Sequence, residues 1–72
     1  MTGLIFTKHV LQRLLERKIR KADIKKTIGY PDKERSGWDD TVIVQKKINN
    51  KILRVVYSKK TNKIIIITSY WL

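Results

Sequence analysis

Apolar residues recur at helical spacing in the first quarter of the chain. At 100° per residue, four of them fall within an arc of about 140°; they are Val10, Leu11, Leu14 and Leu15. Thr7 comes just before this stretch, and a threonine hydroxyl can accept hydrogen bonds from the free amides of a first helical turn. The pattern predicts a helix over residues 8–18 whose whole apolar arc packs inward.

A second helix is predicted over residues 21–28. Ile19 and Ile24 stand at the spacing of a hydrophobic staple, and Asp23 lies in the first turn. Gly29 is placed to end the helix in the left-handed conformation, and the following Tyr-Pro prevents its continuation.

The rest of the chain is typical of short strands. Residues 4–6 form a short β candidate, and residues 32–40 are polar and predict a connecting loop, with a brief extended piece near residues 33–35. Three β-rich runs follow: Thr41 to Ile48, Ile52 to Ser58 and Lys63 to Trp71. The order β-α-α-β-β-β predicts one α+β domain over residues 1–72, with two helices packed on one face of a small antiparallel sheet.

The expected turns set the register of this sheet. A two-residue turn at Asn49-Asn50 and a four-residue turn over residues 59–62 are predicted, the latter pairing Ser58 with Lys63. The helix-covered face then holds Val42, Val44, Leu53, Val55, Tyr57, Ile64, Ile66, Thr68 and Tyr70. The opposite face holds Ile43, Gln45, Lys47, Ile52, Arg54, Val56, Ile65, Ile67 and Trp71. Because that face is unusually apolar for a solvated one, a homodimer or a partner peptide is expected to cover it.

The chain is strongly basic, and a protein with such a charge attracts polyanions. Seventeen Lys and Arg against six Asp and Glu give a formal net charge of +11 in 72 residues, so nucleic acid, RNA first, is the expected partner. Solvated surface lysines and an acidic protein partner are the alternatives. The chain has no cysteine and no long apolar run, which favours a cytoplasmic protein and no membrane association.

The only histidine stands in a basic stripe. His9, Arg13 and Arg17 follow one another at steps of four and share one side of the first helix. An imidazole at this position is expected to take the proton of an RNA 2′-hydroxyl as a general base. Arginine forks can hold the phosphate. No second histidine or carboxylate cluster is present, so no metal or cofactor is expected.

Other residues are candidates for the same chemistry. Thr68 and Tyr70 are predicted to approach His9 from the covered face and offer hydroxyl groups. Further phosphate contacts are expected from Lys8, Lys47 and Arg54. The plainer interpretation is a solvated helix edge, in which Arg13 pairs with Glu16, and a strand whose Thr68 and Tyr70 only pack.

These segments resemble a prokaryotic family of unknown function, number 4258. Its pattern is T-x-H-A-x-x-R-x-x-x-R-G-I, an acidic helix start, P-D, a strand like L-x-V-V and a closing T-V-Y. The matching segments are Thr7-Lys8-His9-Val10, Arg13, Glu16-Arg17-Lys18-Ile19, Asp23-Ile24, Tyr30-Pro31-Asp32, Leu53-Arg54-Val55-Val56 and Thr68-Ser69-Tyr70-Trp71. The chain departs from the pattern at Val10, at Lys18 in place of glycine, and at Arg20, where a serine or threonine cap is common.

The resemblance implies a likeness to the RelE and ParE toxins and to the ribonuclease group of barnase and the colicin nucleases. It thereby implies metal-independent cleavage of RNA, as the toxin of a toxin-antitoxin pair with an acidic antitoxin. His9, Arg13 and Arg17 match polar helix positions of the family, and Thr68 and Tyr70 match its closing motif. Because ParE-like proteins act by binding a topoisomerase, a non-catalytic module that binds nucleic acid or protein is the alternative.

Overall fold

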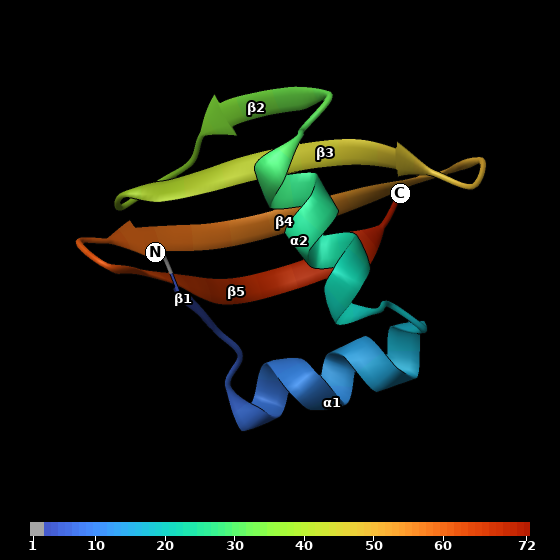
Figure 1. The fold of residues 1–72 in the computed structure, drawn as a ribbon, viewed down its shortest axis with the longest axis horizontal. Helices are drawn as coiled ribbons and strands as arrows, with labels where there is room; N and C mark the ends of the chain where they lie inside the picture. Colours follow the sequence, from blue (N-terminus) through green and yellow to red (C-terminus); the bar gives the residue numbers. More distant parts are fainter. Residues whose placement is uncertain (1–2) are drawn as a thin grey trace.

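The computed structural model describes residues 3–72, which form two helices and a five-stranded mixed sheet (Figure 1). The elements are β1 Gly3–Ile5, α1 Lys8–Arg17, α2 Lys21–Gly29, β2 Lys33–Ser36, β3 Thr41–Ile48, β4 Lys51–Lys60 and β5 Lys63–Trp71. The predicted α+β class is confirmed. The order gains one strand, because the extended piece expected near residues 33–35 pairs with β3.

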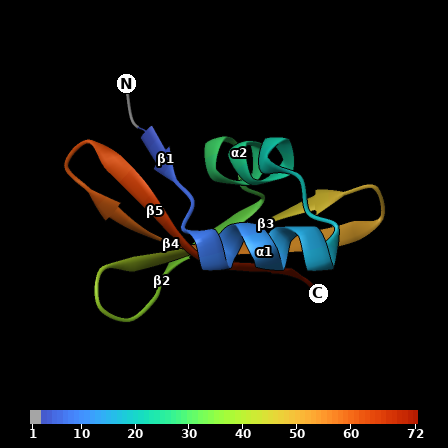
Figure 2. The ribbon, with the colours of Figure 1, turned by 90° about the horizontal axis from the view of Figure 1, so that it is seen from below.

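The sheet has the strand order β1-β5-β4-β3-β2. Strands β3 to β5 form the predicted antiparallel meander and β2 extends it, whereas β1 lies parallel to β5 and makes the sheet mixed. Helix α2 crosses one face over β3 and β4, and α1 lies along β5 at the edge of the sheet (Figures 1 and 2). We call the face under α2 the inner face and the opposite face the outer face.

Both ends of α1 have defined caps. The Thr7 hydroxyl accepts from the Val10 amide at 3.2 Å, as predicted. At the other end Lys18 adopts the left-handed conformation with φ 56°, and the Ile19 amide donates to the Leu14 carbonyl at 2.9 Å. The family pattern has glycine at the position of Lys18. The left-handed conformation is least strained for glycine, so the lysine side chain adds steric strain here.

Helix α2 begins as predicted and ends differently. Ile19 and Ile24 are buried on either side of its first turn, as a hydrophobic staple requires. The expectation that Gly29 ends the helix in the left-handed conformation is wrong. Gly29 is the last helical residue, and the capping Tyr30 has φ −137° and donates its amide to the Lys26 carbonyl at 2.8 Å.

The core lies between the helices and the inner face. Its buried members are Val10, Leu14, Ile19, Ile24, Val44, Leu53, Val55, Tyr57, Ile64 and Ile66. The prediction that Leu15 packs inward is wrong, because its side chain is 82% exposed. A helix at the sheet edge has the core on one side only, so the far end of its apolar arc faces solvent.

The register is partly as predicted. Asn49 and Asn50 form the expected two-residue turn with φ 49° and 68°, and Ile48 pairs with Lys51. The second turn is shorter than predicted, since Lys60 pairs with Lys63 and only Thr61 and Asn62 connect the strands. Ser58 therefore pairs with Ile65 instead of Lys63. This shift of two residues leaves the faces unchanged at this end of β5.

A β-bulge in β5 changes the faces at its other end. Tyr57 pairs with Ile66 and Val56 pairs with Thr68, so Ile67 has no partner in β4. One extra residue turns over every side chain that follows it. The predicted faces of Thr68, Tyr70 and Trp71 are therefore wrong: Thr68 and Tyr70 lie on the outer face.

Ser69 and Trp71 consequently lie on the inner face, beside α1. The Arg17 guanidinium donates to the Ser69 carbonyl at 2.7 Å, and the Trp71 indole N–H donates to the Arg17 carbonyl at 2.8 Å. We call these two hydrogen bonds the α1–β5 link. It holds the C-terminal end of α1 against the C-terminal half of β5, which has no pairing with β1.

The left-handed Lys18 predicts that glycine at this position stabilises the fold. Lys18→Gly should raise the free energy of unfolding by about 0.5–1 kcal/mol, because the αL strain removed exceeds the added entropy of the unfolded chain. Urea denaturation measures the change. Lys18→Ala is the matched control, since it removes the same charge and keeps the strain; equal gains from both variants would show that repulsion among lysines, and not backbone strain, is relieved.

The α1–β5 link predicts a specific cost for losing the indole N–H. Trp71→Phe keeps an aromatic ring but removes the donor to Arg17, and it should lower the free energy of unfolding by about 1 kcal/mol. Trp38, which is 65% exposed, provides the control substitution Trp38→Phe. Equal urea midpoints for the two variants would contradict a stabilising role of this bond.

Candidate functional site

The basic stripe of α1 forms one wall of a hollow, and β5 forms the other. This hollow has a volume of about 80 Å³ and is lined by His9, Val10, Arg13, Arg17, Ile67, Thr68 and Ser69. We call it the His9 hollow. A hollow of this volume admits small polar groups such as water molecules or phosphate oxygens. None of its lining residues is acidic, so its electrostatics favour an anion.

The two arginines of the hollow are held differently. Arg17 is half-buried and fixed by its bond to the Ser69 carbonyl. Arg13 is exposed and pairs with Glu16 at 3.1 Å, the ion pair expected for a solvated helix edge. A guanidinium has five N–H donors, so a single bond to Ser69 leaves Arg17 able to donate to a phosphate oxygen.

Thr68 reaches the hollow by a route that the sequence did not predict. It lies on the outer face, but β5 is next to α1 at the sheet edge, so Thr68 lines the hollow as well. Its neighbour Ser69 is 2% exposed, and the Ser69 hydroxyl has no hydrogen-bond partner among residues 3–72. A buried hydroxyl without a partner is costly, and nothing in the sequence distinguished Ser69 from a packing residue.

Tyr70 is not part of the His9 hollow. It points to the outer face, where its hydroxyl accepts from the Arg54 guanidinium at 3.3 Å. The predicted approach of Tyr70 to His9 is wrong, because the bulge places it on the other side of β5. His9, Arg13, Arg17 and Thr68 are therefore the predicted catalytic residues that the structure brings together.

The predicted phosphate-binding residues lie on two surfaces. Lys8 is exposed at the start of α1, one residue before His9. Lys47 and Arg54 lie on the outer face, and Lys47 is exposed near the end of β3. Lys33 and Arg35 of β2 share this face through their pairing with Gln45 and Ile43. The sequence analysis missed them, although the alternation Lys-Glu-Arg was a signal for a strand with both cations on one face.

The outer face is less apolar than predicted. Trp71 belongs to the inner face, Val56 is 4% exposed, and the apolar side chains more than one third exposed here are Ile52 and Ile67. The homodimer or partner peptide expected on this face stays a prediction, with a smaller apolar surface to support it.

No group of three His, Cys, Asp or Glu side chains among residues 3–72 lies close enough together to hold a metal ion. No helix that the structure describes is long and apolar enough to cross a membrane.

Comparison with known proteins gives one match. The profile of a family described as "Domain of unknown function (DUF4258)" matches residues 6–71. Neither the curated proteins nor the solved structures contain a match to the chain. The matched stretch covers both helices, β2 to β5 and the His9 hollow. The chain therefore belongs to the DUF4258 family of domains.

Proposed function

We propose that the protein is a metal-independent endoribonuclease whose reaction takes place in the His9 hollow. One observation carries this proposal: α1 and β5, which are far apart in the chain, bring His9, Arg13, Arg17 and Thr68 to a single hollow that has no acidic lining residue. The +11 net charge supports a polyanionic substrate.

The chemistry uses groups that line the hollow. The His9 imidazole takes the proton of a ribose 2′-hydroxyl, and the resulting oxygen attacks the adjacent phosphorus. The bond from phosphorus to the 5′-oxygen of the next nucleotide breaks, and that oxygen takes a proton from solvent. Arg17 and Arg13 stabilise the charge that builds on the phosphate oxygens. The products are a 2′,3′-cyclic phosphate and a free 5′-hydroxyl.

A second candidate is a protein-binding module of the kind that the resemblance to ParE-like proteins implies, and an exposed apolar surface on α1 supports it. Leu15 is 82% exposed and lines an apolar depression with Leu11, Leu14 and Ile19, beside Arg20 and Lys21. An acidic, apolar partner segment suits such a surface. As a toxin, the protein would carry both the RNA site and a surface for its antitoxin; as a non-catalytic module, it would carry the second alone.

The ribonuclease proposal predicts that His9→Ala abolishes cleavage. Purified protein is incubated with RNA in EDTA, and the rate should fall by about 10²–10⁴-fold, the usual contribution of a general base. Gln12→Ala, at an exposed position of the same helix, is the control and should cleave like the wild type. Products must end in a 2′,3′-cyclic phosphate. Absence of cleavage by the wild type, or full cleavage by His9→Ala, would contradict the proposal.

The unpartnered Ser69 hydroxyl predicts opposite effects on stability and on activity. Ser69→Ala should raise the free energy of unfolding by about 1 kcal/mol, because it removes a buried polar group that has no partner. The same variant should cleave RNA about 10-fold more slowly, because the hydroxyl donates to the bound phosphate. Denaturation and single-turnover cleavage measure the two effects. A more stable variant with unchanged cleavage would exclude Ser69 from the site.

A further inference from the structure

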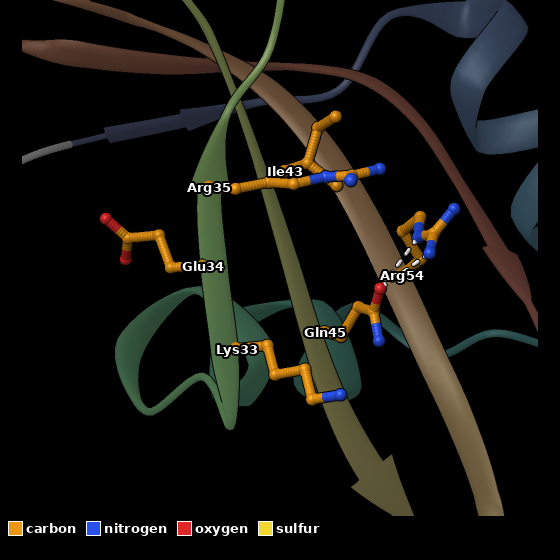
Figure 3. A pocket seen from close by; sticks show the side chains of 6 residues that line it. All are labelled: Lys33, Glu34, Arg35, Ile43, Gln45 and Arg54. Carbon is orange, nitrogen blue, oxygen red and sulfur yellow. Dashed lines mark hydrogen bonds between the residues drawn. The ribbon is translucent and has the colours of Figure 1, made fainter.

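A second, larger recess lies on the outer face. It has a volume of about 450 Å³ and is lined by Lys33, Glu34 and Arg35 of β2, Ile43 and Gln45 of β3, and Arg54 of β4 (Figure 3). We call it the β2–β4 cleft. Figure 2 shows the β2–β3 hairpin bending to the side of the sheet opposite α2, which makes this face concave.

Arg54 is held in a fixed orientation beside this cleft. Its Nε and Nη2 donate to the Gln45 side-chain oxygen at 3.1 and 2.6 Å, and its Nη1 donates to the Tyr70 hydroxyl at 3.3 Å. Gln45, Arg54 and Tyr70 stand opposite one another on neighbouring strands. The partners of the guanidinium are therefore neutral, and its positive charge is not compensated by an ion pair.

The other side chains of the cleft add to this charge. Figure 3 shows Lys33 and Arg35 extending from β2 over the cleft, whereas Glu34 points to the opposite side of the strand. Glu34 lies toward buried Tyr57 on the inner face, where burial and then the Glu34 charge raise the pKa of the tyrosine. Asp32 is bonded to the Lys47 amide at 2.8 Å and pairs with Lys46. Three cations thus face the cleft with no carboxylate directed into it.

The cleft and the His9 hollow are related by strand pairing across the outer face. Arg35, Ile43, Val56 and Thr68 form a row of paired residues across the outer face, and Thr68 also lines the hollow. Tyr70, the partner of Arg54, is two residues from Thr68, or about 7 Å along the strand. An extended polyanion that leaves the hollow past Thr68 meets the Arg54 guanidinium next.

We propose that the β2–β4 cleft binds the part of a single-stranded RNA that flanks the cleaved phosphate, with Arg54 holding a phosphodiester and Lys33 and Arg35 the next one. This inference rests on the proposed function, because cleavage in the His9 hollow sets the direction in which the RNA strand runs to the cleft. The hydrogen bonds to Gln45 and Tyr70 orient the Arg54 guanidinium before RNA binds. The orientation of this group therefore contributes to affinity together with its charge. A single strand is favoured because it bends into a concave face and offers a base to the Arg54–Tyr70 pair.

The test measures binding separately from cleavage. The full-length chain carrying His9→Ala, which keeps the RNA intact, is titrated into a labelled RNA of about 12 unpaired nucleotides, and fluorescence anisotropy gives Kd. Adding Arg54→Met should weaken binding at least about 10-fold. Arg54→Lys should recover little of the loss, because an ammonium group lacks the fork. Lys25→Met, at an exposed position of α2, removes the same charge and should change Kd less than about 2-fold.

The β2 cations give an independent variant in case Arg54→Met disturbs the sheet. Lys33→Met with Arg35→Met changes exposed side chains of an edge strand, and it should weaken binding and flatten the salt dependence of log Kd, since phosphate contacts are lost. Circular dichroism checks that each variant is folded.

Three results would overturn the proposal: affinities of the Arg54 and β2 variants equal to that of Lys25→Met, equal affinity for a duplex of the same length, or displacement of the RNA by polyglutamate at matched charge. The last would assign the cleft to an acidic protein. If the wild type does not cleave RNA but the cleft variants still lose affinity for it, the proposed ribonuclease function is wrong and the proposed binding site is supported.

Discussion

The arrangement of both candidate sites depends on one unpaired residue, Ile67. Without the bulge at this position, alternation along β5 would direct Thr68 and Tyr70 toward α2 and turn Trp71 to the outer face. With it, the indole of Trp71 reaches the Arg17 carbonyl, and the Ser69 carbonyl is available to the Arg17 guanidinium. The same reversal sends the Tyr70 hydroxyl to Arg54. Bulges are common at sheet edges and beside functional sites because they redirect side chains in this way.

The distribution of charge explains why the two recesses are attractive to one kind of ligand. Among residues 3–72 the ion pairs are Arg13–Glu16, Arg20–Asp23 and Lys46–Asp32, so most of the cations have no acidic partner. Unpaired cations repel one another and destabilise a compact state, more so at low salt. On the outer face the repulsion is concentrated around Arg54, whose partners are neutral, and a bound polyanion relieves it. Repulsion among these cations destabilises the free protein, and its relief would contribute to the affinity that we propose for RNA.

Local signals made much of the fold predictable. The Thr7 cap, the Ile19–Ile24 staple and the Asn49-Asn50 turn each depend on residues close together in the chain, and all three are present. The errors concern features that no local pattern encodes. Leu15 is exposed because α1 lies at an edge, and the faces of Thr68 and Tyr70 depend on the bulge in β5. Of the two helix ends, the one that adopts the left-handed conformation is at Lys18 of α1 and not at Gly29 of α2.

The same reasoning explains which part of the site the sequence could predict. Residues spaced by four share one side of a helix whatever the helix packs against, so the stripe of His9, Arg13 and Arg17 follows from sequence alone. The opposite wall depends on the edge strand, and the bulge exchanged one of its hydroxyls for another: Tyr70 left the hollow and Ser69 entered it. The displaced Tyr70 joins Arg54 on the outer face. The bulge therefore converts one predicted site into two neighbouring ones, with Thr68 at the boundary that the proposed RNA strand would cross.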